Sequence, residues 1–381
     1  MTDPGDEGAS TSGSSSFLGQ HLEIDTDSAY GDDSESVLSA FTSAMSAATD
    51  YRYENGRRYH AYDDGAYYLP NDEDELDRLD LQHEMWKMVL KGALYMSPIP
   101  DSVQSVLDVG CGTGVWSIQF AEEHPGAQVI GTDLSPVQPS FVPPNCSFLV
   151  DNAEKEWAFD QKFDFVHVRM LCMGMHSWPR FFRQCWENME PGGWLEVREI
   201  MFPWGAAGHG PQDLEQIAKS PLLEWSDLVR QGAAKVGIDT KACLRFEELL
   251  RGQGFVNVRR KDVQWPLGIW PKGEEQKKLG AYAVENLKSG LQGISTAVFS
   301  RNLGMSREEI EVRLAHARKD LKEGRYYAPI FMYSCQKPDV QKASAEPAFE
   351  ARTISDAPAS GKHSDNGKDQ EPESNGRRMP Q

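Results

Sequence analysis

The sequence of 381 residues predicts an α/β fold built on a doubly wound, mostly parallel sheet. Two observations predict it. Short apolar segments typical of buried strands alternate with helical segments between residues 105 and 200. The first of these strands also runs into a glycine turn, "GCGTG", that opens the next helix, and an open α/β sheet binds its ligand at such a turn.

The strands follow one another as short apolar runs, each ended by glycine or by polar residues. We expect parallel strands at 105–110, 127–133, 146–152, 162–170 and 194–200. A helix is expected at 115–124, directly after the glycine turn. A second helix is expected from Trp178, with Pro179 near its start and Gly192 and Gly193 at its end.

Helical segments flank this alternating core. Before it, 69–90 begins with a capping Asn and Asp and an acidic first turn, and Leu76, Leu79 and Trp86 then recur at helical spacing. After residue 200, we expect helices within 211–236 and 245–255, an extended segment at 256–268 and a helical insertion at 273–324. A last strand is expected within 328–338.

Both ends of the chain have the composition of disordered tails. Residues 1–50 contain ten acidic residues, many serines and no Lys or Arg, and 339–381 are similarly polar. Such segments bury too little apolar surface to offset the entropy lost on ordering. We therefore expect one folded domain at 51–338, in which 51–100 form an N-terminal helical cover.

Composition excludes several classes of protein. The net charge of −19 argues against a surface for direct nucleic-acid binding. The N-terminus lacks the positive region of a secretory signal, and no apolar run is long enough to span a membrane. The six cysteines are scattered, with no Cys-x-x-Cys pair, which indicates reduced thiols and neither a disulfide framework nor a metal site.

Polar residues stand at the carboxyl ends of three successive strands. Gly110, Gly112 and Gly114 follow the first strand, and Asp133 ends the second, 23 positions after Gly110. A carboxylate near this offset reaches ribose hydroxyls. Asp151 and Asn152 end the third strand, where a side chain meets an adenine edge. The three strand ends together predict an adenosine site, although such acids also occur as simple turn caps.

The glycine spacing distinguishes two kinds of adenosine cofactor. A pyrophosphate-binding loop has the pattern Gly-x-Gly-x-x-Gly, and here its third glycine position is Val115. Asp108 also lies two residues before the first glycine. A carboxylate there repels a pyrophosphate but favours a sulfonium or an α-ammonium group. The loop therefore favours S-adenosylmethionine over NAD.

The order of these motifs resembles a known family. "VLDVGCGTGVW", "VIGTDLSPVQP", "DNAEKEW", "FDFVHVRML" and "EPGGWLEVREI" resemble the successive motifs of class I S-adenosylmethionine-dependent methyltransferases. "ENGRRYHAYDDGAYYLPNDEDELDRLDLQHEMW", "VPPNCSF" and the final "YSCQKP" resemble, more narrowly, the fungal LaeA-like methyltransferases. The resemblance covers roughly 53–338.

The resemblance implies a Rossmann-like, seven-stranded sheet with helices on both faces. It adds a sixth and a seventh strand, both antiparallel, at 256–265 and 329–337, with the helical insertion between them. It also assigns S-adenosylmethionine as cofactor. Residues implied for the amino-acid part of the cofactor are Asp108, Gly110, Cys111, Gly112, Thr113 and Gly114. Asp133 would bind the ribose, Leu134 would pack by the adenosine, Asp151 and Asn152 would meet the adenine, and Arg169 would lie between cofactor and substrate.

Methyl transfer needs alignment, a dry pocket and, for weak nucleophiles, a base. His176, in the loop after the fourth strand, is our candidate base, although a lone histidine is more often structural. His60, His83, His167, Glu196 and Glu199 are weaker candidates. Several aromatic residues, among them Trp204 and Trp265, are candidates for an apolar substrate pocket or for the core.

Two functions remain open. One is a cytoplasmic tailoring enzyme that methylates an O, N or S atom of a small secondary metabolite. The other is a LaeA-like regulator of metabolite gene expression, which would lie in the nucleus with protein partners. The absence of a strong basic import cluster favours the enzyme, since Arg259, Arg260 and Lys261 form only a short run. The glycine spacing disfavours a third reading, an NAD-dependent oxidoreductase.

Overall fold

The computed structural model describes residues 49–63, 65–208 and 210–339. The tails expected at 1–50 and 339–381 therefore lie outside the described residues, except for positions 49, 50 and 339. All further structural statements concern the described ranges.

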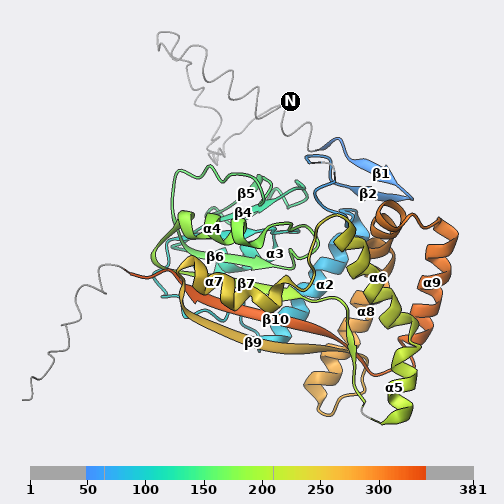
Figure 1. The fold of residues 1–381 in the computed structure, drawn as a ribbon. Coiled ribbons are helices and arrows are strands. Elements are labelled where there is room, and N and C mark those ends of the chain that lie inside the picture. Colours follow the sequence, from blue (N-terminus) through green and yellow to red (C-terminus); the bar gives the residue numbers. More distant parts are fainter. Residues whose placement is uncertain (1–48, 64, 209, 340–381) are drawn as a thin grey trace, which may run out of the picture. The chain divides into compact units, whose positions relative to one another are not determined.

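The centre of the fold is a mixed sheet with five parallel strands in the order β5-β4-β3-β6-β7. Their bounds are β3 Ser105–Val109, β4 Gln128–Asp133, β5 Cys146–Val150, β6 Phe163–Arg169 and β7 Met189–Ile200. β10 (Tyr326–Gln336) continues the sheet beside β7 and runs antiparallel to it. The predicted mostly parallel sheet with an antiparallel last strand is confirmed (Figure 1).

The far edge of this sheet differs from the expectation in two respects. β9 (Val256–Leu267) pairs antiparallel with β10, so it runs in the same direction as β7, and the expectation of an antiparallel sixth strand was wrong. A two-residue strand, β8 (Gly205–Ala206), also pairs with the first residues of β10 and makes the sheet eight-stranded. So short a pairing leaves no periodic signal in a sequence.

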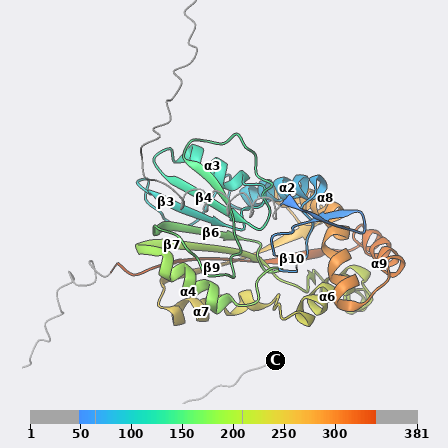
Figure 2. The same ribbon diagram turned by 90° about the horizontal axis from the view of Figure 1, so that it is seen from above.

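Helices cover both faces of the sheet because strand residues alternate between two cores. Val106 and Phe165 pack with Trp116 and Phe120 of α3 (Val115–Glu123). Leu107 and Val166 pack on the opposite side with residues of α4 (Trp178–Asn188) and α7 (Phe246–Gln253). Figure 2 shows α3 on one side of the sheet and α4 and α7 on the other.

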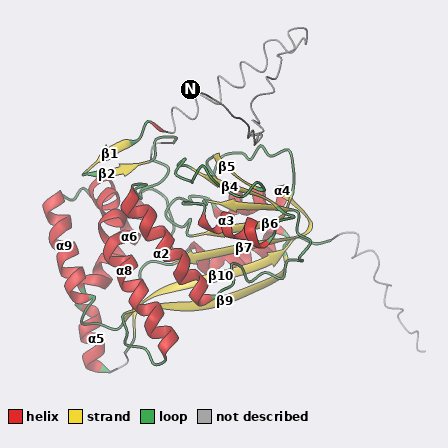
Figure 3. Cartoon of the chain, turned by 180° about the vertical axis from the view of Figure 1, so that it is seen from behind, coloured by secondary structure: helices red, strands yellow, loops and turns green. Residues whose placement is uncertain are grey.

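A group of helices lies at one end of the sheet (Figure 3). It consists of α2 (Glu73–Val89), α5 (Pro211–Ala218), α6 (Pro221–Lys235), α8 (Glu274–Ala297) and α9 (Arg307–Asp320). A 3₁₀ turn, Ala242–Arg245, precedes α7, and a π turn, Val298–Asn302, follows α8. α8 and α9 confirm the helical insertion expected before the last strand.

The segment 51–100 contains a hairpin in addition to the expected helix. β1 (Arg52–Glu54) and β2 (Arg57–Tyr59) are joined by Asn55 and Gly56, which have φ values of 54° and 80°. Asn-Gly is the preferred sequence of such a turn, so the signal was present. α2 begins as expected, with the side chain of Asp72 accepting a hydrogen bond from the Glu75 N–H at 3.2 Å.

The helix before the fifth strand ends earlier than expected. α4 stops at Asn188, and β7 already begins at Met189, although glycines at 192 and 193 had been expected to end the helix. Pro191 disfavours helical geometry in the residue before it. Residues 190–193 then form an irregularity in the pairing with β6.

Within the described residues, no helix combines the length and apolar character that crossing a bilayer requires. All six cysteines are buried and carry free thiols.

Candidate active site

A cavity opens where the carboxyl ends of the parallel strands meet α2 and the helices beyond it. Gly110 after β3, Asp133 at the end of β4, Asp151 after β5 and Arg169 at the end of β6 all line it. The structure thus brings four predicted strand-end positions into one cavity. Leu134, Cys111, Gly112, Thr113 and Asn152 line it as well.

The glycine loop has a backbone that only glycine adopts without strain. Gly110, Gly112 and Gly114 have φ values of 70°, 57° and 77°. A Cβ atom on Gly110 would also lie 2.3 Å from Cδ2 of Leu171, so a side chain there is excluded twice. Gly114 does not line the cavity; a Cβ there would meet the ring of Phe148. The loop therefore requires glycine at these positions, and Gly110 and Gly112 line the cavity at the end of β3.

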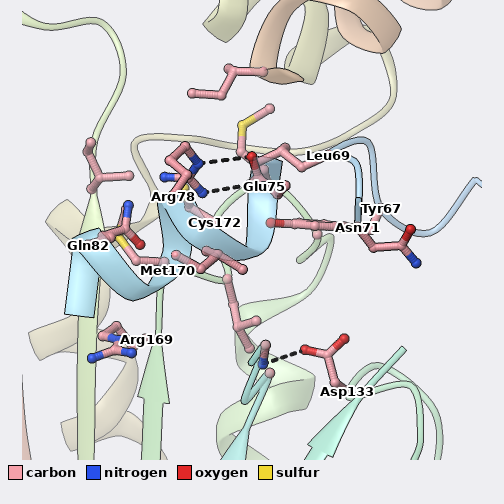
Figure 4. Close-up of a pocket in the computed structure, with 18 of the residues that line it drawn as sticks. Tyr67, Leu69, Asn71, Glu75, Arg78, Gln82, Asp133, Arg169, Met170 and Cys172 are labelled. Carbon is pink, nitrogen blue, oxygen red and sulfur yellow. Dashed lines mark hydrogen bonds and ion pairs between the residues drawn. The ribbon is translucent and has the colours of Figure 1, made fainter. Parts of the chain in front are cut away.

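Asp133 is held by the glycine loop and by its own turn. Its Oδ2 accepts a hydrogen bond from the Gly112 N–H at 2.9 Å, and its Oδ1 accepts one from the Ser135 N–H at 3.0 Å. Figure 4 shows the Asp133 carboxylate at the cavity. Burial raises the pKa of this carboxyl, against the lowering effect of the two N–H groups. Each oxygen keeps a free lone-pair site, so the carboxylate can accept from a pair of ligand hydroxyls.

Asp108 does not line the cavity. Its Oδ2 accepts a hydrogen bond from the Ser117 hydroxyl at 2.6 Å, and its Oδ1 accepts one from His167 Nδ1 at 2.8 Å. The His167 ring in turn stacks on Trp116, with ring centroids 3.8 Å apart. Asp108 therefore lies behind the glycine loop and links β3 to α3 and β6. Its carboxylate therefore supports the loop from the side away from the cavity lining.

The end of β5 contributes a carboxylate with few protein partners. Asp151 Oδ1 accepts a hydrogen bond from the Asn152 N–H at 2.8 Å, and burial raises the pKa of its carboxyl. The Asn152 side chain donates to Asp63 at 2.6 Å and accepts from the Glu154 N–H at 2.9 Å. Asn152 thus ties this edge of the cavity to the N-terminal segment.

Arg169 lies on the cavity floor beside His83 of α2. Its Nη1 donates to His83 Nδ1 at 3.3 Å, and His83 Nε2 then donates to Gln119 Oε1 at 3.1 Å. These partners require a neutral histidine, in agreement with burial lowering the pKa of His83 to about 4. Burial also lowers the pKa of Arg169 to about 10.

The loop after β6 forms the rest of the floor. Met170 has a φ of 62°, which is unusual for a residue with a side chain. Glu199 of β7 lies beneath it and accepts hydrogen bonds from the N–H groups of Leu171 and Cys172 at 2.9 and 3.0 Å. Burial raises the pKa of Glu199 to about 8. Glu199 does not line the cavity, so its position is that of a support for the floor.

His176, the candidate base, lies outside this cavity. Its side chain is 40% exposed, and its Nδ1 lies 2.6 Å from Glu154 Oε2. The other oxygen of Glu154 accepts hydrogen bonds from the N–H groups of His176 and Ser177 at 2.7 and 3.0 Å. Glu154 therefore fixes His176 at the surface, outside the cavity that the strand ends form.

Beyond the strand ends the cavity becomes an apolar chamber, which the sequence analysis did not locate. It lies between α2, the segment after β7, the end of β9 and α8. Its apolar lining includes Leu69, Met85, Ile200, Phe202, Trp204, Trp265, Leu267, Ala283, Leu287 and Ile294. Trp204 and Trp265, two of the aromatic candidates, both line it.

Polar residues of α2 face the same chamber. Glu75, Arg78 and Gln82 are 2%, 5% and 5% exposed and line the cavity (Figure 4). The helix was predicted from its apolar residues, and these three polar residues were not identified as cavity residues. Their spacing of three and four positions, which places them on one face, was the available signal.

Comparisons with known proteins agree with this geometry. A family model described as a methyltransferase domain matches residues 81–259. The chain is 32% identical over 309 residues to "Methyltransferase pytC" of Aspergillus terreus, covering 81% of this chain and 92% of that protein. It is 32% identical to "Probable methyltransferase tdiE" of Emericella nidulans, covering 69% of this chain and 82% of that protein.

Proteins named as regulators are among the similar proteins too, such as "Secondary metabolism regulator laeA" of Aspergillus flavus, which is 31% identical over 316 residues, covering 81% of this chain and 83% of that protein. The chain is 30% identical over 311 residues to "Protein-methionine methyltransferase laeA" of Emericella nidulans, covering 79% of this chain and 80% of that protein. Identity of this extent, together with the cavity at the ends of β3 to β6, establishes the family. The chain belongs to the fungal LaeA-like family of class I S-adenosylmethionine-dependent methyltransferases.

Proposed function

We propose that this enzyme methylates an O, N or S atom of a small secondary metabolite. The observation that carries the proposal is the apolar chamber, which continues directly from the strand ends and is enclosed by α2, α8 and the end of β9. A chamber of this kind suits a largely apolar small molecule. The methyltransferase relatives pytC and tdiE agree with a catalytic role.

The residues at the strand ends fit S-adenosylmethionine. We assign the Gly110–Thr113 backbone to the amino-acid part, Asp133 to the ribose hydroxyls and Leu134 to the adenosine. Asp151 and Asn152 are assigned to the adenine, and Arg169 to the region between cofactor and acceptor. The glycine loop lines the cavity at Gly110 and Gly112 without side chains, and Asp133 keeps acceptor sites beyond its two backbone hydrogen bonds. The cofactor supplies a methyl group activated by its sulfonium.

The protein's own contribution is alignment and exclusion of water. Among the described lining residues, Glu75 is engaged with Arg78, and burial holds the pKa of the Cys111 and Cys172 thiols well above their usual range. Asp133 accepts two backbone N–H groups. The described lining contains no histidine, and its remaining carboxylate, Asp151, is assigned to the adenine, so we propose an acceptor whose nucleophilic atom needs little help in losing a proton.

The alternative is a regulator of secondary-metabolite gene expression. It is favoured by the similarity to laeA, whose name describes methyl transfer to protein methionine, and to "Secondary metabolism regulator laeA" of Aspergillus flavus at 31% identity. In that case the partners would be nuclear proteins and the site of action the nucleus. If the protein is a tailoring enzyme, we propose that it acts in the cytoplasm.

A metabolite profile of the source organism with this gene deleted separates the two proposals. A tailoring enzyme predicts that one product vanishes while a precursor lacking a single methyl group accumulates. Purified enzyme with methyl-deuterated S-adenosylmethionine should then convert that precursor to a labelled product. If many unrelated metabolites fall together and no such precursor appears, the enzyme proposal fails and the regulator is supported.

A further inference from the structure

Gln82 is a buried polar side chain that lines the cavity without a protein partner. It is 5% exposed, and its amide makes no hydrogen bond to any residue in the described ranges. The amide atoms are open to the cavity, where a ligand or water can satisfy them. Figure 4 shows Gln82 on α2, one turn after Arg78.

The two faces of α2 have different neighbours. On one face, the side chain of Asp80 accepts from Thr113 of the glycine loop at 2.8 Å, and His83 bonds Gln119 of α3. On the other face, Arg78 donates to Asn286 of α8 at 3.0 Å. Positions 78, 82 and 85 lie on this second face because four and seven residues separate them in the helix. Gln82 therefore belongs to the chamber side of α2.

Arg78 next to it is already neutralised. Glu75 accepts two of its N–H donors at 2.6 and 2.9 Å, and Asn286 accepts a third. A guanidinium has further N–H donors, which remain for a ligand oxygen. Since the charge of Arg78 is paired within α2, a ligand carboxylate or phosphate gains little from it, whereas a neutral carbonyl or hydroxyl oxygen gains a donor.

We propose that Gln82, with Arg78 beside it, recognises the methyl acceptor, and that the acceptor is a neutral molecule with an apolar body and a polar edge that both accepts and donates hydrogen bonds. This inference rests on the proposed small-molecule function. The carboxamide of Gln82 matches such an edge with its own N–H and C=O groups. The apolar body would lie against Trp265 and Leu287, which line the same chamber.

The test uses the full chain saturated with S-adenosylhomocysteine and three probes that share one ring system. These are 2-naphthamide, which is neutral and both donates and accepts, 2-naphthoate, which is charged, and 2-methylnaphthalene, which has no polar edge. Ligand-observed NMR titrations measure their affinities. We expect 2-naphthamide to bind about tenfold more tightly than either other probe, because one or two hydrogen bonds to the Gln82 amide would supply a difference of that size.

Two variants separate acceptor recognition from other roles of Gln82. Gln82→Met keeps the size of the side chain and should remove the preference for 2-naphthamide without changing S-adenosylhomocysteine affinity in calorimetry. Gln292→Met is the matched control, because Gln292 of α8 donates to Glu311 at 2.9 Å and does not line this cavity. Thermal unfolding of both variants checks that they fold.

Three results would overturn the inference. Equal binding of the three probes to the wild type would refute the neutral polar edge. An unchanged preference in Gln82→Met would refute the role of Gln82. Weaker S-adenosylhomocysteine binding in Gln82→Met would assign Gln82 to the cofactor. A preference for 2-naphthamide combined with a deletion strain that accumulates no precursor would leave the pocket chemistry standing and refute only the biosynthetic role.

Discussion

Replacing Asp133 by alanine should weaken cofactor binding by roughly a hundredfold. Each oxygen of Asp133 accepts one backbone N–H, from Gly112 or Ser135, and retains one acceptor site toward the cavity. Two ribose hydroxyls at those sites would each contribute about 1.5 kcal/mol, as hydrogen bonds to a charged group do. Their loss, about 3 kcal/mol, corresponds to roughly two decades in the dissociation constant. Calorimetry with S-adenosylhomocysteine measures it.

Asp164→Ala provides the matched control. Asp164 at the start of β6 also accepts two backbone N–H groups, from Gln104 and Ser105, at 2.9 and 3.0 Å, but it does not line the cavity. Both variants should lose comparable thermal stability, because both leave two amides without their carboxylate. Only Asp133→Ala should lose affinity. If it binds S-adenosylhomocysteine as tightly as the wild type does, the ribose role is wrong.

Three further predictions concern the loop, a histidine and the chamber. Gly110→Ala should lower thermal stability and abolish cofactor binding, since the φ of Gly110 is 70° and a Cβ there would lie 2.3 Å from Leu171. Gly126→Ala is the control, because a Cβ there would meet nothing within 4 Å. It should change neither the cofactor affinity measured by calorimetry nor the melting temperature. His83 is neutral in the fold, with a pKa lowered to about 4, and protonated in the unfolded chain below about 6.5. The unfolding free energy should therefore fall as pH drops from about 6.5 to 4, by up to about 1.4 kcal/mol per pH unit from this group, and His83→Gln should show a shallower slope in denaturant titrations; equal slopes would contradict the assignment. Arg78→Met should lower the free energy of unfolding by about 3–5 kcal/mol, because it leaves the Glu75 carboxylate buried and unpaired. The double variant with Glu75→Gln should recover part of that loss. No recovery would show that Arg78 stabilises the fold through packing and not through its charge.

The cavity lining at the strand ends could be predicted from sequence because it is local. Each of its residues follows a strand within a few positions, and parallel strands bring their carboxyl ends to one edge. Gly110, Asp133, Asp151 and Arg169 needed only the strands to be identified. The direction in which a strand side chain points could not be predicted in the same way. Asp108 turns toward Ser117 and His167, and nothing in the spacing distinguishes that orientation from one toward the cavity.

His176 shows that the direction of a loop side chain cannot be predicted from its position in the sequence. Its position after a strand suggested a place near the acceptor, but a loop residue's direction depends on partners elsewhere in the chain. Glu154, 22 residues earlier, accepts from both its ring and its backbone and holds it at the surface. The left-handed conformation of Met170 also redirects the loop, and Glu199 from the next strand fixes that bend. The hydrogen bonds of Glu154 and Glu199 join distant parts of the chain, so no local sequence pattern indicates them.

The apolar chamber depends entirely on contacts between residues that are far apart in the chain. Arg78 and Asn286, which lie 208 residues apart in the chain, meet across the chamber, and Trp86 of α2 packs edge-on against Trp265 of β9. None of these residues lies at the strand ends to which we assign the cofactor. Substitutions on α2 or α8 can therefore change what the chamber accepts without altering the glycine loop or the sheet. An intact cofactor loop consequently does not distinguish a metabolite-modifying enzyme from a regulator, and the question turns on the side chains of the chamber wall, with Gln82 the first to test.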